Sequence, residues 1–291
     1  VLTLLKAEEL KSVIGHELAH HLLWSRDGGE FHIADRLLLA VATDPRAAAC
    51  HEQTARRFQL YTEIFADRGS LHVTGDVDTV VAGLVKLETG LSQVSAPSYL
   101  KQAAEVFAKG MQATEGLSHP EAFIRARALA LWQEQSEAAG AQIAAMIEGA
   151  AALDDLDLLG QVRLAKATRR LIEYFVQPKW FQTPVVLGQA KLFFADFTPA
   201  ASRDAAALGE VKSTDAKLGE YFCYVLLDFA TADPELDDLP LAAALELSRQ
   251  LDLEAQFEKL AAKELKLKAR ELRKLKEQAA GMLAKAEVSG E

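Results

Sequence analysis

Residues 8–23 read EELKSVIGHELAHHLL, and within them residues 16–20 read His-Glu-Leu-Ala-His. Apolar residues recur at three- and four-residue spacing through this stretch, which predicts a helix. Two histidines four residues apart on a helix project from one face, so His16 and His20 can bind one metal ion. Glu17 faces the same cleft, where it can take a proton from the water that attacks a substrate.

Residues 63–67 read Glu-Ile-Phe-Ala-Asp on a separate predicted helix. Glu63 and Asp67 are four residues apart and share a helix face. A zinc site with two histidines needs a third protein ligand and acceptors that orient the imidazoles. We expect Glu63 to be that ligand and Asp67 to be that acceptor. The alternatives are a chance match of the first motif and an exposed acidic face for the second, but together the motifs favour one Zn²⁺ per chain.

Three ordered stretches carry a resemblance to a known family: EELKSVIGHELAHHLL at 8–23, YTEIFADRGS at 61–70 and SHPEAFIRARAL at 118–129. Over about residues 1–130 the chain resembles the gluzincin metallopeptidases that include the HtpX heat-shock protease and the CAAX prenyl endopeptidase. The resemblance implies that His16, His20 and Glu63 bind zinc and that Glu17 is the catalytic base. The implied activity is metalloendopeptidase cleavage of a peptide or protein substrate.

The third stretch adds Ser118-His119-Pro120 and Arg125. The resemblance implies that His119 lies near the active site and stabilises the oxyanion. It also implies that Arg125 ties its helix to the site through a carboxylate. The alternatives are a histidine at a helix start with no catalytic duty and an arginine in a surface ion pair.

The visible start of the chain departs from the family pattern. Residue 1 is Val rather than Met, and VLTLL at 1–5 leads almost directly into the first motif. We therefore interpret the chain as a fragment. Family members often carry transmembrane helices and have an edge strand upstream of the zinc helix that can pair with an extended peptide. On this interpretation, the upstream strands and part of the substrate cleft are missing.

Composition limits the classes of partner. The formal net charge of −10 argues against nucleic acid as the main partner. Cys50 and Cys223 form no metal-binding pattern, and two thiols are too few for a disulfide framework. A reducing compartment, and hence a cytoplasmic location, is expected. The longest apolar runs, such as 37–42 and 222–227, are too short to span a bilayer, so no membrane association is visible.

Apolar periodicity and the scarcity of proline predict a mainly α chain. The expected helices cover about 7–26, 32–43, 46–72, 77–90, 98–113, 120–138, 156–177, 184–196, 217–231, 239–250 and 254–287. Asp76 and Ser98 resemble N-caps, and Pro120 suits a first helical turn. Strands are expected only at 1–5 and near 71–74.

The stretch 139–155 is rich in Ala and Gly and then acidic, which indicates a linker. It divides the chain into two expected domains. Residues 1–138 form a zinc metallopeptidase domain with the helical core of a zincin. Residues 156–291 form a helical C-terminal domain.

An acidic turn, from Asp228 to Asp238, separates two helices within residues 221–265. This order resembles the small helical TerB-like modules associated with tellurite resistance, whose acidic turns have been considered metal sites. Pro234 and Pro240 alter the turn, so a solvated acidic loop that caps helices is the favoured interpretation.

The last predicted helix interleaves Lys and Arg with Glu and carries a partial apolar seam at Leu265, Leu272, Leu275 and Met282. The favoured interpretation is a charged helix that packs on its domain or forms a short coiled coil. A membrane surface or nucleic acid is the minor alternative, because glutamates dilute the positive face.

A second function class stays open. The chain can be read as an interaction or scaffold protein that recruits a protein partner through its C-terminal helices and whose zinc site is structural or vestigial. Glu17 argues against this, because a structural site needs no base. The remaining histidines have no partner at ligand spacing and are read as structural or surface residues: His21, His32, His51 and His72.

Overall fold

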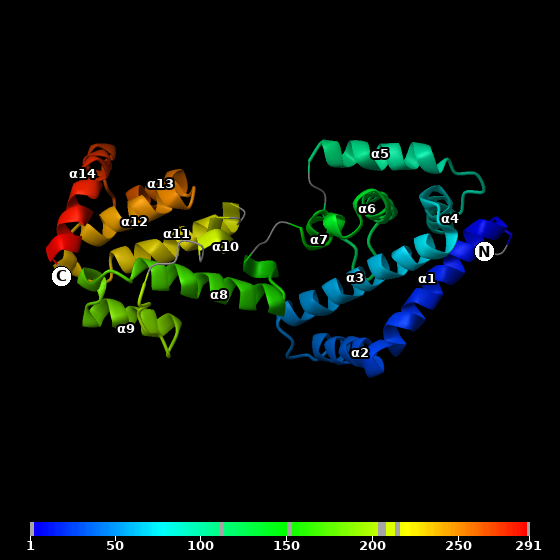
Figure 1. Cartoon of the computed structure of the whole chain (residues 1–291), viewed down its shortest axis with the longest axis horizontal. Helices are drawn as coiled ribbons and strands as arrows, with labels where there is room; N and C mark the ends of the chain where they lie inside the picture. The colour runs from blue at the N-terminus through cyan, green and yellow to red at the C-terminus, as the bar shows by residue number, and fades with distance from the viewer. Residues whose placement is uncertain (1–2, 111–112, 150–152, 203–207, 213–215, 290–291) are drawn as a thin grey trace. The chain divides into compact units, whose positions relative to one another are not determined.

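The computed structural model describes residues 3–110, 113–149, 153–202, 208–212 and 216–289 (Figure 1). These residues are mainly helical and none lies in a strand, which confirms the mainly α class. The strand expected near 71–74 is wrong, because these residues form the last turn of helix α3 (Ala49–Thr74). Of the strand expected at 1–5, residues 3–5 form turns, and residues 1–2 lie outside the described residues.

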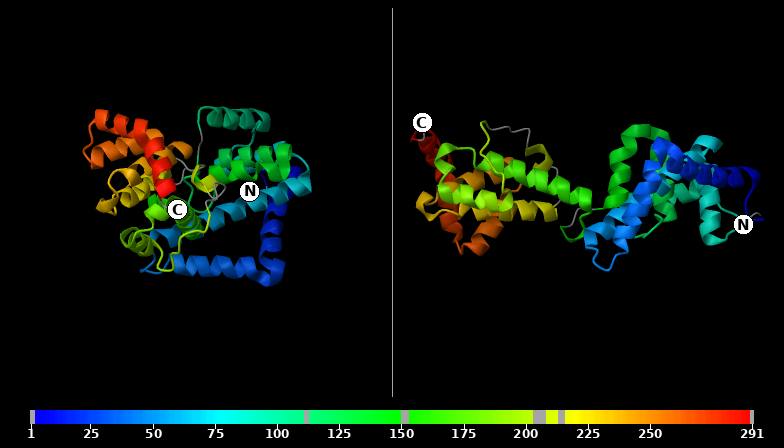
Figure 2. Two further views of the ribbon diagram at one scale, coloured as in Figure 1. Left: turned by 60° about the vertical axis from the view of Figure 1, so that its left-hand side comes forward. Right: turned by 90° about the horizontal axis from the view of Figure 1, so that it is seen from below.

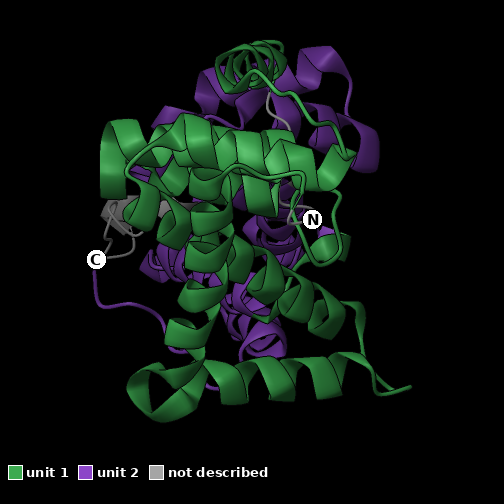
Figure 3. Ribbon diagram, turned by 90° about the vertical axis from the view of Figure 1, so that its right-hand side faces the viewer, with its two compact units in different colours: residues 1–150, 154–158 green, residues 151–153, 159–291 purple. Residues whose placement is uncertain are grey.

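The chain divides into two compact units (Figure 3). Unit 1 comprises residues 1–150 and 154–158, and unit 2 comprises residues 151–153 and 159–291. All of the predicted site residues belong to unit 1. Its helices in the described part are α1 (Ala7–Ser25), α2 (Glu30–Ala42), α3, α4 (Val77–Thr89), α5 (Ala96–Ala108), α6 (Ala122–Gln135) and α7 (Gly140–Glu148).

Helices α1 and α3 run antiparallel in close contact (Figures 1 and 2), because small residues line their interface. A Cβ atom added at Gly69 of α3 would lie 2.4 Å from the Cβ atom of Ala19. A Cβ atom added at Gly15 would lie 2.3 Å from Cγ2 of Val73. Since no larger side chain fits at either glycine, these positions hold the two motif-bearing helices at short range.

The apolar stripe predicted for the first helix does not face the core. Ile14, Leu18 and Leu22 are 51%, 58% and 59% exposed. The face of α1 that packs inside is instead built from Glu9, Ser12, Gly15, Ala19 and Leu23. Despite these exposed aliphatic side chains, no helix among the described residues combines the length and the apolar content needed to cross a membrane.

A buried ion pair joins α1 to α4. The two carboxylate oxygens of Glu9 accept hydrogen bonds from Nζ of Lys86 at 2.9 and 2.8 Å. The Glu9 and Lys86 side chains are only 5% and 3% exposed. Burial raises the pKa of Glu9, but the bonds from Lys86 and from the backbone N–H of Lys6 outweigh burial and bring the pKa below its usual value. The pair therefore ties α4 to α1, the helix that carries His16 and His20.

Helix α6 is buried on two faces. One face packs on α4 and α5 through Ala122, Ala126 and Leu129. The other packs on α3 and α7 through Ile124, Ala128 and Leu131. Because both faces are held, the start of α6 has a fixed place beside α3.

The predicted linker at 139–155 is wrong over most of its length. Residues 140–148 form α7, whose apolar side chains are buried in the core of unit 1: Ile143, Met146 and Ile147. The Ala- and Gly-rich composition therefore reflects a closely packed helix. Beyond the predicted linker, Asp157 pairs with Arg57 of α3 at 3.0 Å, and both side chains are nearly buried. Residues 154–158 accordingly belong to unit 1.

Unit 2 is helical throughout its described residues. Its helices are α8 (Leu158–Phe175), α9 (Pro184–Phe193), α10 (Gly209–Lys212), α11 (Ala216–Ala230), α12 (Leu239–Gln250), α13 (Glu254–Glu264) and α14 (Ala269–Ser289). The single last helix expected at 254–287 is wrong, because Lys266 adopts a φ of 55° and separates α13 from α14. Leu272 and Leu275 are buried on the domain core.

Helix starts agree only in part with the expectation. Asp76 caps α4, since its carboxylate accepts from the backbone N–H groups of Asp78 and Thr79. Ser98 is not a cap: it lies inside α5 and donates its own N–H to the hydroxyl of Ser95. Pro120 lies just outside α6, which begins at Ala122.

Candidate metal centre

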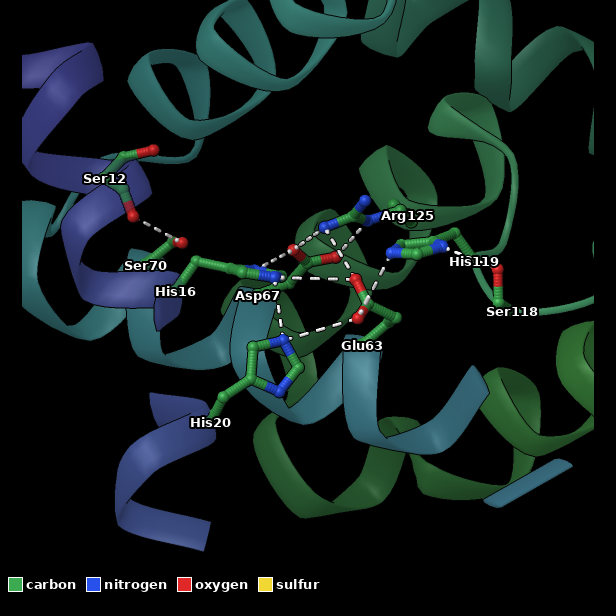
Figure 4. Close-up of polar contacts among 9 residues, drawn as sticks. All are labelled: Ser12, His16, His20, Glu63, Asp67, Ser70, Ser118, His119 and Arg125. Carbon is green, nitrogen blue, oxygen red and sulfur yellow. Dashed lines mark hydrogen bonds and ion pairs between the residues drawn. The ribbon is translucent and has the colours of Figure 1, made fainter. Parts of the chain in front are cut away.

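The predicted ligands lie on α1 and α3, the two helices that contact each other closely through small residues. His16 and His20 are one turn apart on α1, and Glu63 and Asp67 are one turn apart on α3. Figure 4 shows both imidazoles directed at the carboxylate of Glu63. The antiparallel packing thus brings together two motifs that are far apart in sequence.

Two of the three distances between the donor atoms match those between the ligands of one zinc ion, and the third is shorter. The Nε2 atoms of His16 and His20 are 3.0 Å apart. Nε2 of His16 lies 3.5 Å from Oε2 of Glu63, and Nε2 of His20 lies 3.3 Å from Oε1. Zinc binds such atoms at about 2.0–2.2 Å, so that ligands around one tetrahedral ion are about 3.3–3.6 Å apart. The three residues are the one group of potential metal ligands found among the described residues.

One carboxylate oxygen of Glu63 has no hydrogen bond of ordinary length. Oε2 of Glu63 is buried and accepts no such bond from the described residues, and its nearest donors are Nε2 of His16 at 3.5 Å and Nη2 of Arg125 at 3.6 Å. A buried charged oxygen is costly unless a donor or a cation compensates it. A divalent cation held between the three side chains would supply that compensation.

Asp67 orients the first histidine. Its Oδ1 atom lies 3.2 Å from Nδ1 of His16, so Nδ1–H donates and Nε2 is left to bind a metal. Arg125 donates to Asp67 from Nε at 2.8 Å and from Nη2 at 2.5 Å, and Nη2 also lies 3.6 Å from Oε2 of Glu63. Arg125 therefore ties α6 to the carboxylates of α3.

The charges of these groups are strongly coupled. Burial lowers the pKa of His16, but hydrogen bonds to Asp67 and Glu63 outweigh burial and raise the pKa to about 9. Burial raises the pKa of Glu63, whereas His16, His20 and Arg125 bring it well below its usual value. The pKa of Asp67 is lowered in the same way, with burial opposed mainly by Arg125. A metal ion that binds His16 at neutral pH must therefore displace a proton.

Glu17 lies beside two of the predicted ligands in an open cleft. The cleft has a volume of about 480 Å³, and His16, Glu63, Asp67 and Glu17 all line it. Glu17 itself is exposed. The structure thus places the predicted base and two of the predicted ligands, His16 and Glu63, on the lining of one cleft.

His119 approaches the centre from the segment before α6. Its side chain is 62% exposed, and Nε2 lies 3.6 Å from Oε1 of Glu63. Nδ1 lies 2.9 Å from the hydroxyl oxygen of Ser118. His119 and Arg125 therefore both reach Glu63, as Figure 4 shows.

Sequence reasoning missed two features of this site. The ring of Trp24 stacks on His20, with centroids 6.2 Å apart and planes 14° apart. Trp24 follows His20 by one helical turn, a spacing that could have revealed it. The second feature is α4, which supplies Val80, Leu84 and Glu88 to the cleft. No motif marks these residues, and only the tertiary structure brings them to the site.

The other histidines do not join the cluster. Nδ1 of His51 accepts from the backbone N–H of Ala48 at the start of α3. His32 makes an edge contact with Trp24. His21 and His72 are exposed. None of the four belongs to the group of potential metal ligands.

The acidic turn of unit 2 has a capping role. Asp233 accepts from the backbone N–H of Glu235 in a short 3₁₀ turn and from the hydroxyl of Thr183 at 2.6 Å. Within the described part of the chain, the turn contributes no residue to a group of potential metal ligands. These contacts fit the favoured expectation of an acidic loop that caps helices.

Comparisons of the chain with models of protein families, with curated proteins and with solved structures found no match.

Proposed function

We propose that this protein is a zinc-dependent metallopeptidase of the gluzincin type that hydrolyses peptide bonds in peptide or protein substrates. One observation carries the proposal: donor atoms of His16, His20 and Glu63 lie within 4.8 Å of one another, and His16 and Glu63 line a cleft that Glu17 also lines. Structural zinc sites are closed by four protein ligands, whereas catalytic sites keep a position open. The described residues supply three ligands, two of which line the open cleft, which favours the catalytic class.

The chain's own residues have separable tasks in this reaction. A bound Zn²⁺ supplies Lewis-acid activation of water and of the scissile carbonyl group. Glu17 accepts a proton from the attacking water and then delivers a proton to the leaving amine. Asp67 keeps the Nε2 lone pair of His16 directed at the ligand cluster, and Arg125 holds Asp67 in place.

His119 is the proposed donor to the oxyanion. When the hydroxyl of Ser118 donates to Nδ1, the neutral imidazole carries its proton on Nε2. That nitrogen points toward Glu63, where a substrate carbonyl oxygen would lie beside the ligand cluster. A donor in this place stabilises the negative charge that develops during attack.

Metal content and peptidase activity test the proposal together. The full chain is purified without added metal, its zinc content is measured by elemental analysis, and cleavage of an unstructured protein is followed by mass spectrometry. We expect about one zinc per chain, cleavage that a chelator abolishes, and recovery when zinc is restored. Less than about a tenth of an equivalent with no uptake on titration would contradict the metal assignment.

Zinc binding without any hydrolysis would favour the alternative of an interaction protein with a structural or vestigial site. The cytoplasmic location and a protein partner for the C-terminal helices stay predictions.

A further inference from the structure

The cleft beside the ligand cluster has an aliphatic wall. Val80, Leu84 and Leu87 line it from α4, and Val13 lines it from α1. Residues 80, 84 and 87 have the spacing that places side chains on one stripe of a helix. Leu87 is 40% exposed, so part of this wall is open to a ligand.

The rest of the cleft is acidic. Five carboxylate side chains line it: Glu17, Glu63, Asp67, Glu88 and Glu121. The guanidinium of Arg125 is the one Lys or Arg group among the described lining residues, and it is bonded to Asp67. Five negative charges, Arg125 and protonated His16 give −3, and a bound Zn²⁺ that displaces the His16 proton leaves −2. The cleft therefore has a negative field that a single zinc ion does not cancel.

Two of these carboxylates have no cation bonded to them. Oε1 of Glu121 accepts from the backbone N–H of Glu115 at 3.0 Å, and its Oε2 is buried without a hydrogen bond from the described residues. Arg56, whose charge interacts with Glu121, donates its hydrogen bonds to the carbonyl oxygens of Thr114 and Gly116.

Glu88 occupies the last turn of α4, adjoining the aliphatic wall. It is exposed, and the described residues make no hydrogen bond or ion pair with it. Glu88 is therefore available to a charged group of the ligand, whereas Glu121, with one oxygen bonded and the other buried, adds only its charge to the field of the cleft.

We propose that this cleft selects peptide segments in which an aliphatic side chain packs on the wall of α4 and a neighbouring lysine or arginine faces Glu88, with the charge of Glu121 adding to the attraction. The inference rests on the proposed peptidase function and names its substrate class. Burial of an aliphatic side chain supplies affinity. The two carboxylates attract a basic residue and repel an acidic one, so that discrimination has both an attractive and a repulsive part.

The test begins with cleavage-site profiling of the zinc-loaded full chain on a mixed library of unstructured peptides. The best substrate is then made with Lys, Gln or Glu at the charged position. We expect kcat/KM to fall in that order, with about a tenfold span between Lys and Glu at low salt. The span should narrow at high salt, because exposed charges are screened.

Variants identify the residues that cause the preferences for a basic and for an aliphatic side chain. The double variant Glu88→Gln and Glu121→Gln should lose most of the Lys-over-Glu preference and keep its zinc. Leu84→Ala should reduce the preference for a large aliphatic residue by about fivefold. Glu105→Gln, on α5 outside the cleft, is the matched control and should leave both preferences unchanged.

Binding to the Glu17→Gln variant is measured in parallel for three designed peptides that carry Lys, Gln or Glu next to a leucine, because binding reports on the cleft without bond cleavage. Equal affinity and equal cleavage for Lys and Glu peptides would overturn this inference and leave the peptidase function standing. Selective binding with no cleavage of any library peptide by the wild-type chain would overturn the peptidase function and support the selectivity of the cleft.

Discussion

Arg125 donates two parallel hydrogen bonds to the carboxylate of Asp67, and Asp67 in turn lies 3.2 Å from Nδ1 of His16. Three helices, α6, α3 and α1, are therefore connected through one carboxylate. Two-point contact of this kind fixes both the position and the plane of the acceptor. The orientation of a predicted metal ligand thus depends on a residue from a third, distant stretch of sequence.

The two carboxylates of α3 should differ in their effect on zinc affinity. Glu63→Ala removes a ligand and should abolish tight binding, whereas Asp67→Ala should weaken binding by about 10–100-fold, because it only releases His16. Competitive titration with a chelator ranks the variants. Glu52→Ala, an exposed carboxylate in the first turn of α3, should bind like the wild type. A larger loss for Asp67 than for Glu63 would reverse the assignment.

Replacing the base should separate metal binding from catalysis. Glu17→Gln leaves all three ligands intact, so the zinc content should stay near one per chain while peptidase activity falls by about 10²–10⁴-fold. Elemental analysis and initial rates on one substrate measure the two effects. Turnover near that of the wild type would rule out Glu17 as the base.

The close approach of α1 and α3 should be intolerant of added volume. Gly69→Ala places a methyl group 2.4 Å from the Cβ atom of Ala19, so the helices must separate. We expect a loss of about 1–3 kcal/mol in the free energy of unfolding and weaker zinc binding, since the donor atoms lie on both helices. Denaturant unfolding and chelator titration measure these losses.

Gly188→Ala in α9 is the matched control, because its added Cβ atom meets no atom within 4 Å. It should be neutral or stabilise by about 0.5–1 kcal/mol, as alanine does relative to glycine inside helices. If Gly69→Ala behaved like this control, the two helices would not be as closely packed as described.

The buried pair of Glu9 and Lys86 should give stability a defined pH dependence. Because the pKa of Glu9 is lower in the folded chain than its usual 4.5, ionised Glu9 contributes stability above about pH 4.5. That contribution is lost as the pH falls through the folded-state pKa. Glu9→Gln should cost about 3 kcal/mol at pH 7, because it leaves the Lys86 charge buried without a partner.

The cost of Glu9→Gln should shrink as the pH falls, because the wild-type carboxylate then also takes up a proton. Urea unfolding at pH 7 and at pH 3 measures it. Glu8→Gln is the control, since the Glu8 side chain is 67% exposed and should change stability by less than about 0.5 kcal/mol. A cost for Glu9→Gln that is the same at both pH values would contradict the lowered pKa.

The two units should be separable when the cut respects the end of unit 1. Residues 154–158 belong to unit 1, and Asp157 pairs with the nearly buried Arg57. We expect residues 1–158 to bind zinc alone and residues 159–291 to be helical by circular dichroism with a cooperative melt. A first piece that ends at residue 150 should be less stable than one that ends at 158, because Arg57 then loses its partner Asp157. Aggregation of both pieces after the 158 cut would show that the units need each other.

The sequence allowed most helices to be predicted, because periodicity and caps such as Asp76 are local signals. The prediction from sequence was wrong where a local pattern is compatible with two structures. The Ala- and Gly-rich stretch before residue 150 was read as a linker, yet it packs as α7. The break at Lys266 has no proline or glycine to mark it. The exposure of Ile14 and Leu18 contradicts the core-facing stripe that their spacing predicts.

By itself, the sequence determined which side chains share a helix face: His16 with His20, and Glu63 with Asp67. Helical spacing is a property of neighbouring residues and needs no knowledge of the fold. Only the tertiary structure decided that the two faces meet, because their meeting depends on the steric fit of glycine and alanine between α1 and α3. It also decided that α4 supplies the aliphatic and acidic lining of the cleft, since contacts between distant segments depend on packing that no local pattern encodes.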